Sequence, residues 1–397
     1  MVRKPKNADN LYGYTYEIYP DEEQITQINK TFGCVRFIYN YYLSQQTEDH
    51  QNNKLPWNAT RWNNHCNQVL KDQHTWLKEV DKFAITNALI HLAAAYKNCY
   101  VDHNSNPPSF KSKHSHYQSY TTNMTNYNIK VDHENRTIQL PKLGKVKAHL
   151  HRDFNGSIKS VTISRTPDNR YFVSLLINVE PLLGKPEENN NIIAFDVGIK
   201  AYLVDNSGNK ISNPKYYKNN EKKLAQRQHD FSKKQKGSKN YEKQRLHVAK
   251  MHSRIANCRT DFLHKLSYGI VKENQIIISE DLSILSMSNG QKNSKGIYDA
   301  SWGKFFRMLE YKAKKFGKIY HQIEKYFSSS QICSVCGHKN VKVKDTSVRE
   351  FECDFCGQHH DRDINASINI LNKGLQELGI TQRYATGTSG IGVCCSS

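Results

Sequence analysis

Residues 191–204 read Asn191-Ile-Ile-Ala-Phe-Asp196-Val-Gly-Ile-Lys-Ala-Tyr-Leu-Val204, and this segment predicts the architecture of the second half of the chain. One apolar run ends in Asp196, a glycine follows at position 198, and a second apolar run ends at Val204. A short apolar run bounded by turn signals is typical of a strand buried in a sheet. We therefore expect two strands joined by a glycine turn, with an acid at the end of the first.

The sequence downstream alternates helical and strand patterns. The expected elements are helical material at 215–270 that breaks at Gly237-Ser238 into a hairpin, a helix at 303–316, and strands at 275–279 and 319–324. Strands that alternate with helices are typical of an open α/β sheet. The second half of the chain is therefore expected to form such a sheet.

Three acids occupy comparable places in this pattern. Asp196 and Glu280 end apolar strands, and Asp363 lies at the start of a helix. Ligands of an open α/β sheet gather at the carboxyl ends of its strands, so acids placed there can converge. Mg²⁺ prefers oxygen ligands, and two such ions can support hydrolysis of a phosphodiester. An isolated acid is more often an N-cap or an ordinary strand-end residue, and Asp363 alone fits the N-cap interpretation equally well.

Four cysteines form two matched pairs, Cys333-x₂-Cys336 and Cys353-x₂-Cys356, separated by sixteen residues. Two such knuckles complete a tetrahedral, closed site for one structural Zn²⁺, and a glycine after each pair suits the tight turn. Disulfides and a redox Cys-x-x-Cys motif are the alternatives. A reducing compartment disfavours disulfides, and two matched pairs disfavour a redox motif, which would need only one. His338, His359 and His360 are expected to be spectators or nucleic-acid contacts. Four more cysteines are interpreted as buried thiols: Cys34, Cys66, Cys99 and Cys258.

The first half of the chain predicts a β-rich unit with helices inserted after its first strand. Alternation at 11–20 predicts a strand, and helical spacing follows at 22–44 and 81–100. Residues 104–120 are expected to form an exposed loop. Five further strands are then predicted, at 129–131, 137–140, 145–150, 160–164 and 171–179. The last two flank a Pro-Asp-Asn turn and are expected to form a hairpin. Residues 183–190 are the clearest linker in the chain.

The charge of the chain favours a polyanionic partner. The 57 Lys and Arg against 37 Asp and Glu give a formal charge of +20, which an enzyme for small molecules does not require. Residues 214–257 contain thirteen basic and three acidic residues, so this short segment carries +10 of that excess. A charge run is usually a solvated helix face, but its density here makes phosphate contact the better interpretation.

The N-terminal ten residues lack the apolar segment of a signal peptide, and no apolar run reaches the roughly 20 residues of a membrane span. We expect a soluble protein of a reducing compartment that does not bind membranes. In a prokaryote this is the cytoplasm, in association with the nucleoid.

Several ordered motifs resemble those of the TnpB nucleases of insertion sequences, the OrfB family. The RuvC-type motifs are matched by Phe195-Asp196-Val-Gly-Ile-Lys200, Ser279-Glu280-Asp-Leu282 and Asp361-Arg-Asp363-Ile-Asn-Ala366. Ser328-Ser-Ser-Gln-Ile-Cys-Ser-Val-Cys-Gly337 is similar to the entry to their zinc ribbon, and Thr31-Phe-Gly-Cys-Val-Arg-Phe-Ile-Tyr-Asn40 to their first helix. The resemblance spans residues 14 to 373.

The resemblance implies a multidomain α/β fold. Residues 1–185 would form a wedge β-barrel with a helical recognition insertion at about 22–125. Residues 186–330 and 360–374 would form an RNase H-like RuvC domain that encloses a zinc ribbon at 331–359, and 375–397 would be a disordered tail. The implied catalytic carboxylates are Asp196, Glu280 and Asp363, whereas Asp281 and Asp361 are expected to have no metal role.

The implied function is RNA-guided cleavage of double-stranded DNA by two-metal Mg²⁺ hydrolysis. The guide RNA would come from the element's own end, and a short DNA motif would flank the target. A compact type V CRISPR effector, a transposase and a non-catalytic zinc-ribbon DNA-binding protein remain alternatives.

Overall fold

The computed structural model describes residues 11–51, 57–102, 105–179, 190–289, 293–345 and 347–380. The chain divides into two compact units, residues 1–183 and 184–397, which are described separately here. The N-terminal ten residues, the linker expected at 183–190 except its last residue, and the tail from 381 lie outside the described residues.

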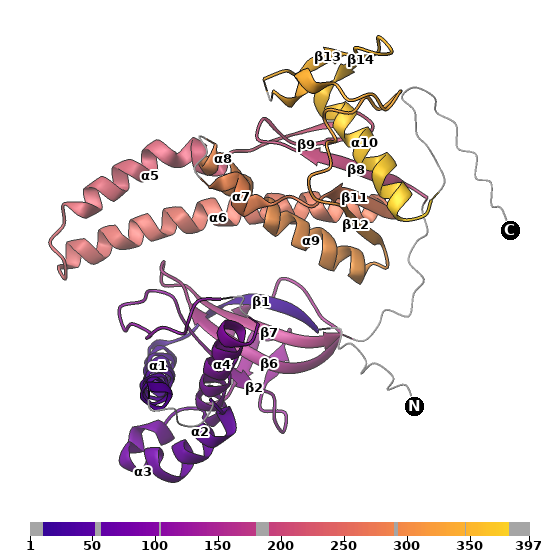
Figure 1. Ribbon diagram of the computed structural model, residues 1–397. Coiled ribbons are helices and arrows are strands. Elements are labelled where there is room, and N and C mark those ends of the chain that lie inside the picture. Colours follow the sequence, from indigo (N-terminus) through magenta and orange to yellow (C-terminus); the bar gives the residue numbers. More distant parts are fainter. Residues whose placement is uncertain are drawn as a thin grey trace, which may run out of the picture. The chain divides into compact units, whose positions relative to one another are not determined.

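The first unit is built on a seven-stranded antiparallel sheet with the order β2-β6-β7-β1-β5-β4-β3, curled into a half-barrel (Figure 1). Its strands are β1 (Leu11–Tyr19), β2 (Gln118–Asn123), β3 (Lys130–Asp132), β4 (Thr137–Leu140), β5 (Gly144–His149), β6 (Gly156–Arg165) and β7 (Tyr171–Val179). Alternate residues of β1 point into the core, and Tyr14, Tyr16 and Ile18 are buried. The period-2 pattern therefore predicted the inward face of this strand correctly.

The helices of this unit are inserted between β1 and β2, as expected. They are α1 (Glu22–Gln51), α2 (Ala59–His65), η1 (Cys66–Leu70), α3 (Lys71–Gln73), η2 (Thr75–Lys78) and α4 (Lys82–Tyr100). Asp21 and Gln24 cap the start of α1 reciprocally, each accepting the other's backbone N–H. Asp81 caps α4 through the N–H of Phe83.

The second unit contains a five-stranded mixed sheet with the order β10-β9-β8-β11-β12, and a separate two-stranded sheet. Its strands are β8 (Ile192–Val197), β9 (Ala201–Asp205), β10 (Lys210–Ser212), β11 (Ile276–Glu280), β12 (Ile319–Ile323), β13 (Glu350–Glu352) and β14 (His359–Asp361). Strands β8, β11 and β12 are parallel, whereas β9 pairs antiparallel with β8 and β10 pairs antiparallel with β9. The two strands and glycine turn predicted for 191–204 are confirmed as β8 and β9.

Helices cover both faces of the five-stranded sheet. The helices of this unit are α5 (Tyr216–Ser232), α6 (Lys239–Glu273), α7 (Ile284–Ser288), α8 (Ser294–Ala300), α9 (Trp302–Lys315), α10 (Arg362–Glu377) and the short η3 (Val341–Lys344), of which α6 and α9 pack on one face of the sheet and α10 on the other. Phe195 and Ile277 face a core shared with α6 and α9. Ala194 and Ile278, their neighbours in sequence, face a core shared with α10. Burial on both faces explains why these strands are apolar at consecutive positions.

Some sequence-based expectations need correction. The loop expected at 104–120 is wrong at its end, since β2 begins at Gln118 and Tyr120 is buried. Other short elements were missed where the sequence is polar: α2, η1, α3, η2, α7, α8, β10, η3, β13 and β14. The predicted hairpin at 215–270 is confirmed as α5 and α6, but Cys258 is exposed on α6 because it faces away from the core. The disordered tail expected from 375 is wrong for its first residues, since α10 continues to Glu377 with Leu375 buried. Among the described residues, no helix has the length and apolar character of a bilayer span.

Candidate active site and metal centre

Asp196 and Glu280 lie at the same level on neighbouring strands. β8 and β11 pair in parallel with Ile276 beside Ile192 and Ile278 beside Ala194, and the same register puts Glu280 beside Asp196. Both acids therefore lie at the carboxyl end of the sheet, two residues beyond the last paired residues of β8 and β11, which are Ala194 and Ile278. Asp363 lies in the first turn of α10, the helix that packs over β8 and β11.

The three carboxylates influence one another electrostatically. Burial, followed by repulsion from Glu280 and Asp363, raises the pKa of Asp196 well above its usual value. Burial also raises the pKa of Glu280, and a hydrogen bond donated by the Ser329 hydroxyl opposes that effect. A group of half-buried carboxylates is a donor set suited to a hard cation. Among the described residues, only the four cysteines form a group of possible metal ligands whose ligand atoms all lie within 4.8 Å of one another. The oxygen atoms of the three carboxylates are therefore spread more widely than that.

The two acids next to the candidate site have other partners. Asp281 pairs with Lys325 at 3.2 Å. Asp361 accepts the N–H groups of Asp363 and Ile364, and its other oxygen pairs with Lys210 Nζ at 2.6 Å. Asp361 is therefore the N-cap of α10, and the N-cap interpretation of Asp363 is wrong.

Asp363 has a cationic neighbour that the sequence did not indicate. The Arg349 guanidinium lies 3.3 Å from the Asp363 carboxylate, just before β13 begins. Since Arg349 stands fourteen residues before Asp363, neither spacing nor strand position singles it out. It adds a positive group at the edge of the carboxylate cluster.

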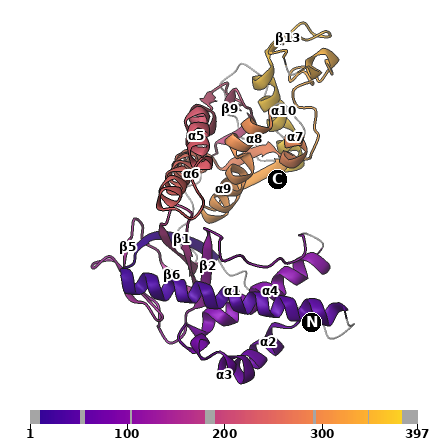
Figure 2. The same cartoon turned by 90° about the vertical axis from the view of Figure 1, so that its left-hand side faces the viewer.

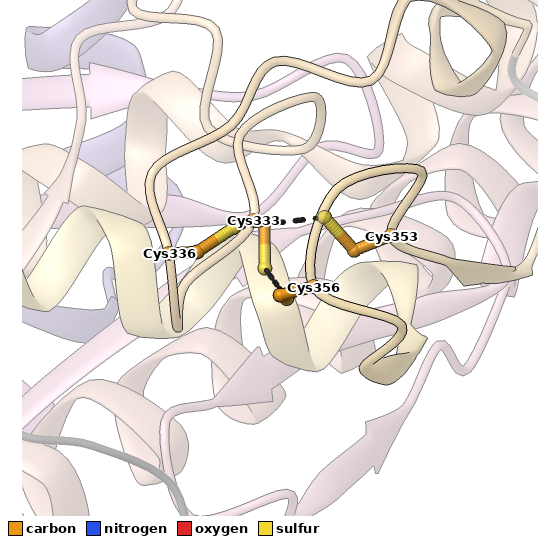
Figure 3. A group of neighbouring side chains, drawn as sticks. All are labelled: Cys333, Cys336, Cys353 and Cys356. Carbon is orange, nitrogen blue, oxygen red and sulfur yellow. Dashed lines mark hydrogen bonds between the residues drawn. The ribbon is translucent and has the colours of Figure 1, made fainter.

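Cys333, Cys336, Cys353 and Cys356 form a cluster in which all four sulfurs lie within 4.8 Å of one another (Figure 3). The Sγ atoms of Cys333 and Cys356 are 3.7 Å apart, and those of Cys336 and Cys353 are 3.6 Å apart. Tetrahedral Zn²⁺ with Zn–S bonds of about 2.3 Å requires sulfurs about 3.8 Å apart, whereas a disulfide requires about 2 Å. The cluster therefore fits a zinc ion and does not fit two disulfides.

The backbone around the cysteines has the turns that the sequence predicted. Gly337 and Gly357 have φ of 78° and 71°, where glycine avoids the strain of a side chain. Each donates its N–H to the carbonyl of the first cysteine of its knuckle, at 2.9 Å. The N–H groups of Cys356 and Phe355, with the Asn340 amide, outweigh the opposing effect of burial and lower the pKa of Cys353 to about 6.

Two further side chains support the cysteines, and one corrects an expectation. His360 was expected to be a spectator or a nucleic-acid contact, but it is buried, and its Nε2 lies 3.1 Å from Cys333 Sγ. Its position on β14 turns it inward, opposite to His359. The buried Asn340 donates to His338 O and Cys353 Sγ and accepts the N–H of Asp354, so it joins the two knuckles. Asn340 lies in a polar stretch that carried no signal in the sequence.

The basic segment forms the long α5–α6 hairpin, whose two helices lie side by side in both views (Figures 1 and 2). Its base is held by Asp299 of α8, which accepts the N–H groups of Tyr217 and Lys218 and pairs with Arg259 at 2.8 Å. Lysines in the turn between the helices are exposed: Lys233, Lys234 and Lys236. The hairpin therefore presents positive charge on a rigid support.

The fold and its two sites define a mixed α/β protein with a carboxylate cluster at a sheet edge and a four-cysteine cluster. Three family models match it: a helix-turn-helix domain of IS605 OrfB proteins over residues 10–54, the "Probable transposase" domain of the same proteins over 173–291, and a "Cas12f1-like, TNB domain" over 302–370. A solved complex of Cas12f1 with sgRNA and target DNA has a similar fold, with a TM-score of 0.54 at 15% identity over 88% of this chain and 83% of that one.

Curated relatives match along almost their whole length. A "Putative RNA-guided DNA endonuclease" of Streptomyces pristinaespiralis is 34% identical over 387 residues, covering 94% of this chain and 91% of the relative. "Putative RNA-guided DNA endonuclease InsQ" of Escherichia coli K12 is 28% identical over 95% of this chain and 96% of its own. The chain belongs to this family, the TnpB-like OrfB proteins of insertion sequences.

Proposed function

We propose that this protein is an RNA-guided DNA endonuclease encoded by a transposable element. The observation that carries the proposal is the register that aligns Asp196 with Glu280 at the sheet edge beside Asp363, in a chain whose relatives bear that name. The protein would act on DNA in the cytoplasm of the prokaryotic cell that carries the transposable element.

The cleavage step would take place at the carboxylate cluster. Asp196, Glu280 and Asp363 would hold Mg²⁺, which supplies a low-pKa water and charge stabilisation for phosphodiester hydrolysis. A bound cation would offset the repulsion that Asp196 experiences from Glu280 and Asp363, and Arg349 places a positive group beside Asp363.

The segments of the chain would then have separate functions in recognition, cleavage and structural support. Residues 1–185 would form the wedge and recognition unit, 186–330 and 360–374 the RuvC domain, and 331–359 a zinc ribbon held by Zn²⁺ on the four cysteines. The guide RNA would come from the element's end, and the target DNA would carry a short flanking motif. The fit of the cysteine sulfurs to Zn–S geometry and the exposed charge of the α5–α6 hairpin support this division.

The first test is to express the protein with its native flanking DNA, purify it and sequence the RNA that accompanies it. One abundant transcript that runs from the gene's 3′ end into neighbouring DNA is the expected result. Absent or heterogeneous RNA would contradict the proposal. Strand-transfer products on element-end DNA would indicate a transposase instead, and a neighbouring CRISPR array a type V effector.

The second test uses DNA matched to that RNA. Asp196→Ala, Glu280→Ala and Asp363→Ala should each lower the cleavage rate by on the order of 10³-fold or more, with binding of RNA and DNA retained. Asp281→Ala is the matched control, because Asp281 is adjacent to Glu280 but pairs with Lys325. Full cutting by any of the first three variants would contradict the site assignment.

A further inference from the structure

The segment that leads into the first cysteine knuckle is attached to α10 by two buried asparagines. Asn369 Nδ2 donates to the carbonyl oxygens of Ser329 and Ile332, at 2.7 and 2.6 Å. Asn365 Nδ2 also donates to Ile332 O, at 2.7 Å, and its Oδ1 accepts the Ser334 N–H at 2.9 Å. The two asparagines are only 6% and 1% exposed, so both carboxamides are committed to holding this backbone.

The same segment contacts the carboxylate cluster through Ser329. This residue is buried, and its hydroxyl donates to Glu280 Oε1. Its carbonyl is the group that Asn369 holds. The position of the hydroxyl is therefore set by α10, the helix that also carries Asp363, and Glu280 and Asp363 share one support.

The segment also continues directly into the cysteine cluster. Ile332, which accepts from both asparagines, precedes Cys333, whose sulfur contacts the buried His360. One residue after His360 comes Asp361, the N-cap of α10. The cysteine cluster is thus tied to α10 at two places, through the backbone at residue 332 and through the N-terminus of the helix.

We propose that Ser329 is a positioning residue for Glu280, and that Asn365 and Asn369 hold Ser329 in place, which makes the entry to the cysteine cluster part of the nuclease site. The proposal rests on the proposed function. Hydrogen bonds from outside the ligand set orient a carboxylate before it binds a metal, and their loss weakens binding without removing a ligand. Ser329 would act through Glu280 and not on the DNA itself.

The test compares Ser329→Ala with Ser329→Thr, which keeps the hydroxyl, and with Ser328→Ala, which removes the adjacent hydroxyl. Each full-length protein is purified with its RNA. The cleavage rate on matched DNA is measured against Mg²⁺ concentration. Mn²⁺ binding is measured by electron paramagnetic resonance on protein freed of its RNA and without DNA, because nucleic-acid phosphates also bind Mn²⁺. Zinc content, melting temperature and affinity for target DNA are recorded in parallel.

Ser329→Ala should require about tenfold more Mg²⁺ for its half-maximal rate and should bind Mn²⁺ about tenfold more weakly. Its zinc content, melting temperature and DNA affinity should match those of the wild-type protein. Ser329→Thr should recover most of the metal affinity, and Ser328→Ala should behave like the wild type. The Mn²⁺ measurement separates metal positioning from any effect on RNA or DNA.

Metal titrations of Ser329→Ala that match the wild type would overturn the proposal. An equal loss in Ser328→Ala, or a loss accompanied by release of zinc, would show a general structural role instead. If the wild-type complex does not cut matched DNA, the proposed function fails, yet the Mn²⁺ affinities of the variants still decide the role of Ser329. A wild-type protein that binds no Mn²⁺ would overturn both.

Discussion

Asp196 bears the largest electrostatic penalty in the carboxylate cluster, because it is buried between Glu280 and Asp363. A carboxyl group whose pKa is raised by folding favours the folded state at low pH, below its ordinary value of 3.8. That contribution is lost as the pH rises through the raised pKa. Without divalent ions, the Asp196 carboxyl therefore lowers the stability of the protein at pH values above its ordinary pKa.

We predict that Asp196→Asn raises the melting temperature at pH 7 in buffer without Mg²⁺, since it removes this repulsion. The gain should shrink as the pH is lowered toward 4, where the wild-type carboxyl is protonated. The variant should also lose most of the stabilisation that added Mg²⁺ gives the wild type. Scanning calorimetry across this pH range checks both effects, and a lower melting temperature at neutral pH would contradict them.

Residue-level prediction from the sequence succeeded where position along an element carries the information. Asp196 and Glu280 were recognised because each ends an apolar strand, and the cysteines because their spacing is regular. Ser329, Arg349 and Asn340 were not assigned roles and His360 was assigned the wrong one, since each contacts a partner distant in sequence. Only tertiary contacts reveal such residues.

At the scale of elements, α10 has a close contact with the sheet that the sequence does not indicate. A Cβ atom built on Gly374 would lie 2.4 Å from Cγ2 of Ile278, a fully buried residue of β11. This distance is far below van der Waals contact, so a side chain there would displace the helix. Because α10 carries Asp363, the displacement would reach the carboxylate cluster.

Gly374→Ala should therefore lower the free energy of unfolding by about 1–3 kcal/mol, the usual cost of overpacking, and should reduce cleavage. The matched control is Gly269→Ala in α6, where a Cβ atom would meet nothing within 4 Å. Alanine at that helical position should instead raise stability by about 1 kcal/mol. Denaturant unfolding of the two variants should thus give changes of opposite sign.

The exposed turn of the α5–α6 hairpin provides a test of nucleic-acid contact. We predict that replacing Lys233, Lys234 and Lys236 together by Gln weakens binding of RNA or DNA. If all three contact phosphates, the plot of log affinity against log salt should become shallower by about 2–3 units. Filter binding at several salt concentrations measures this slope, and an unchanged slope would show that the charge is merely solvated.

Elements with a clear period were predicted well, and short polar ones were not. The strands β1 and β7 and the helices α1, α4, α6 and α9 show burial patterns that follow the period of their sequences, whereas β8 and β11 were predicted from unbroken apolar runs. Helices α2, α7 and α8 are five to seven residues long, too short for a helical period to appear. Their conformation depends on the surfaces against which they pack.

At the scale of the whole molecule, two units with separate cores share one chain. Buried residues of 1–183 form one cluster, and those of 184–397 form others, with the four cysteines in the second unit. Multidomain proteins of this kind need not unfold in a single transition. Zinc bound to the cysteines would stabilise only the unit that contains them.

We therefore predict two calorimetric transitions, one of which depends on zinc. Cys333→Ser, or a chelator strong enough to remove zinc, should lower one melting temperature and impair cleavage while the other transition stays in place. Leu89→Ala, which opens a cavity at a fully buried residue of α4, should shift only the zinc-independent transition, by about 2–5 kcal/mol in free energy. If both variants moved the same transition, or if zinc removal left melting and cutting unchanged, the cysteine cluster would not be the local support of the second unit.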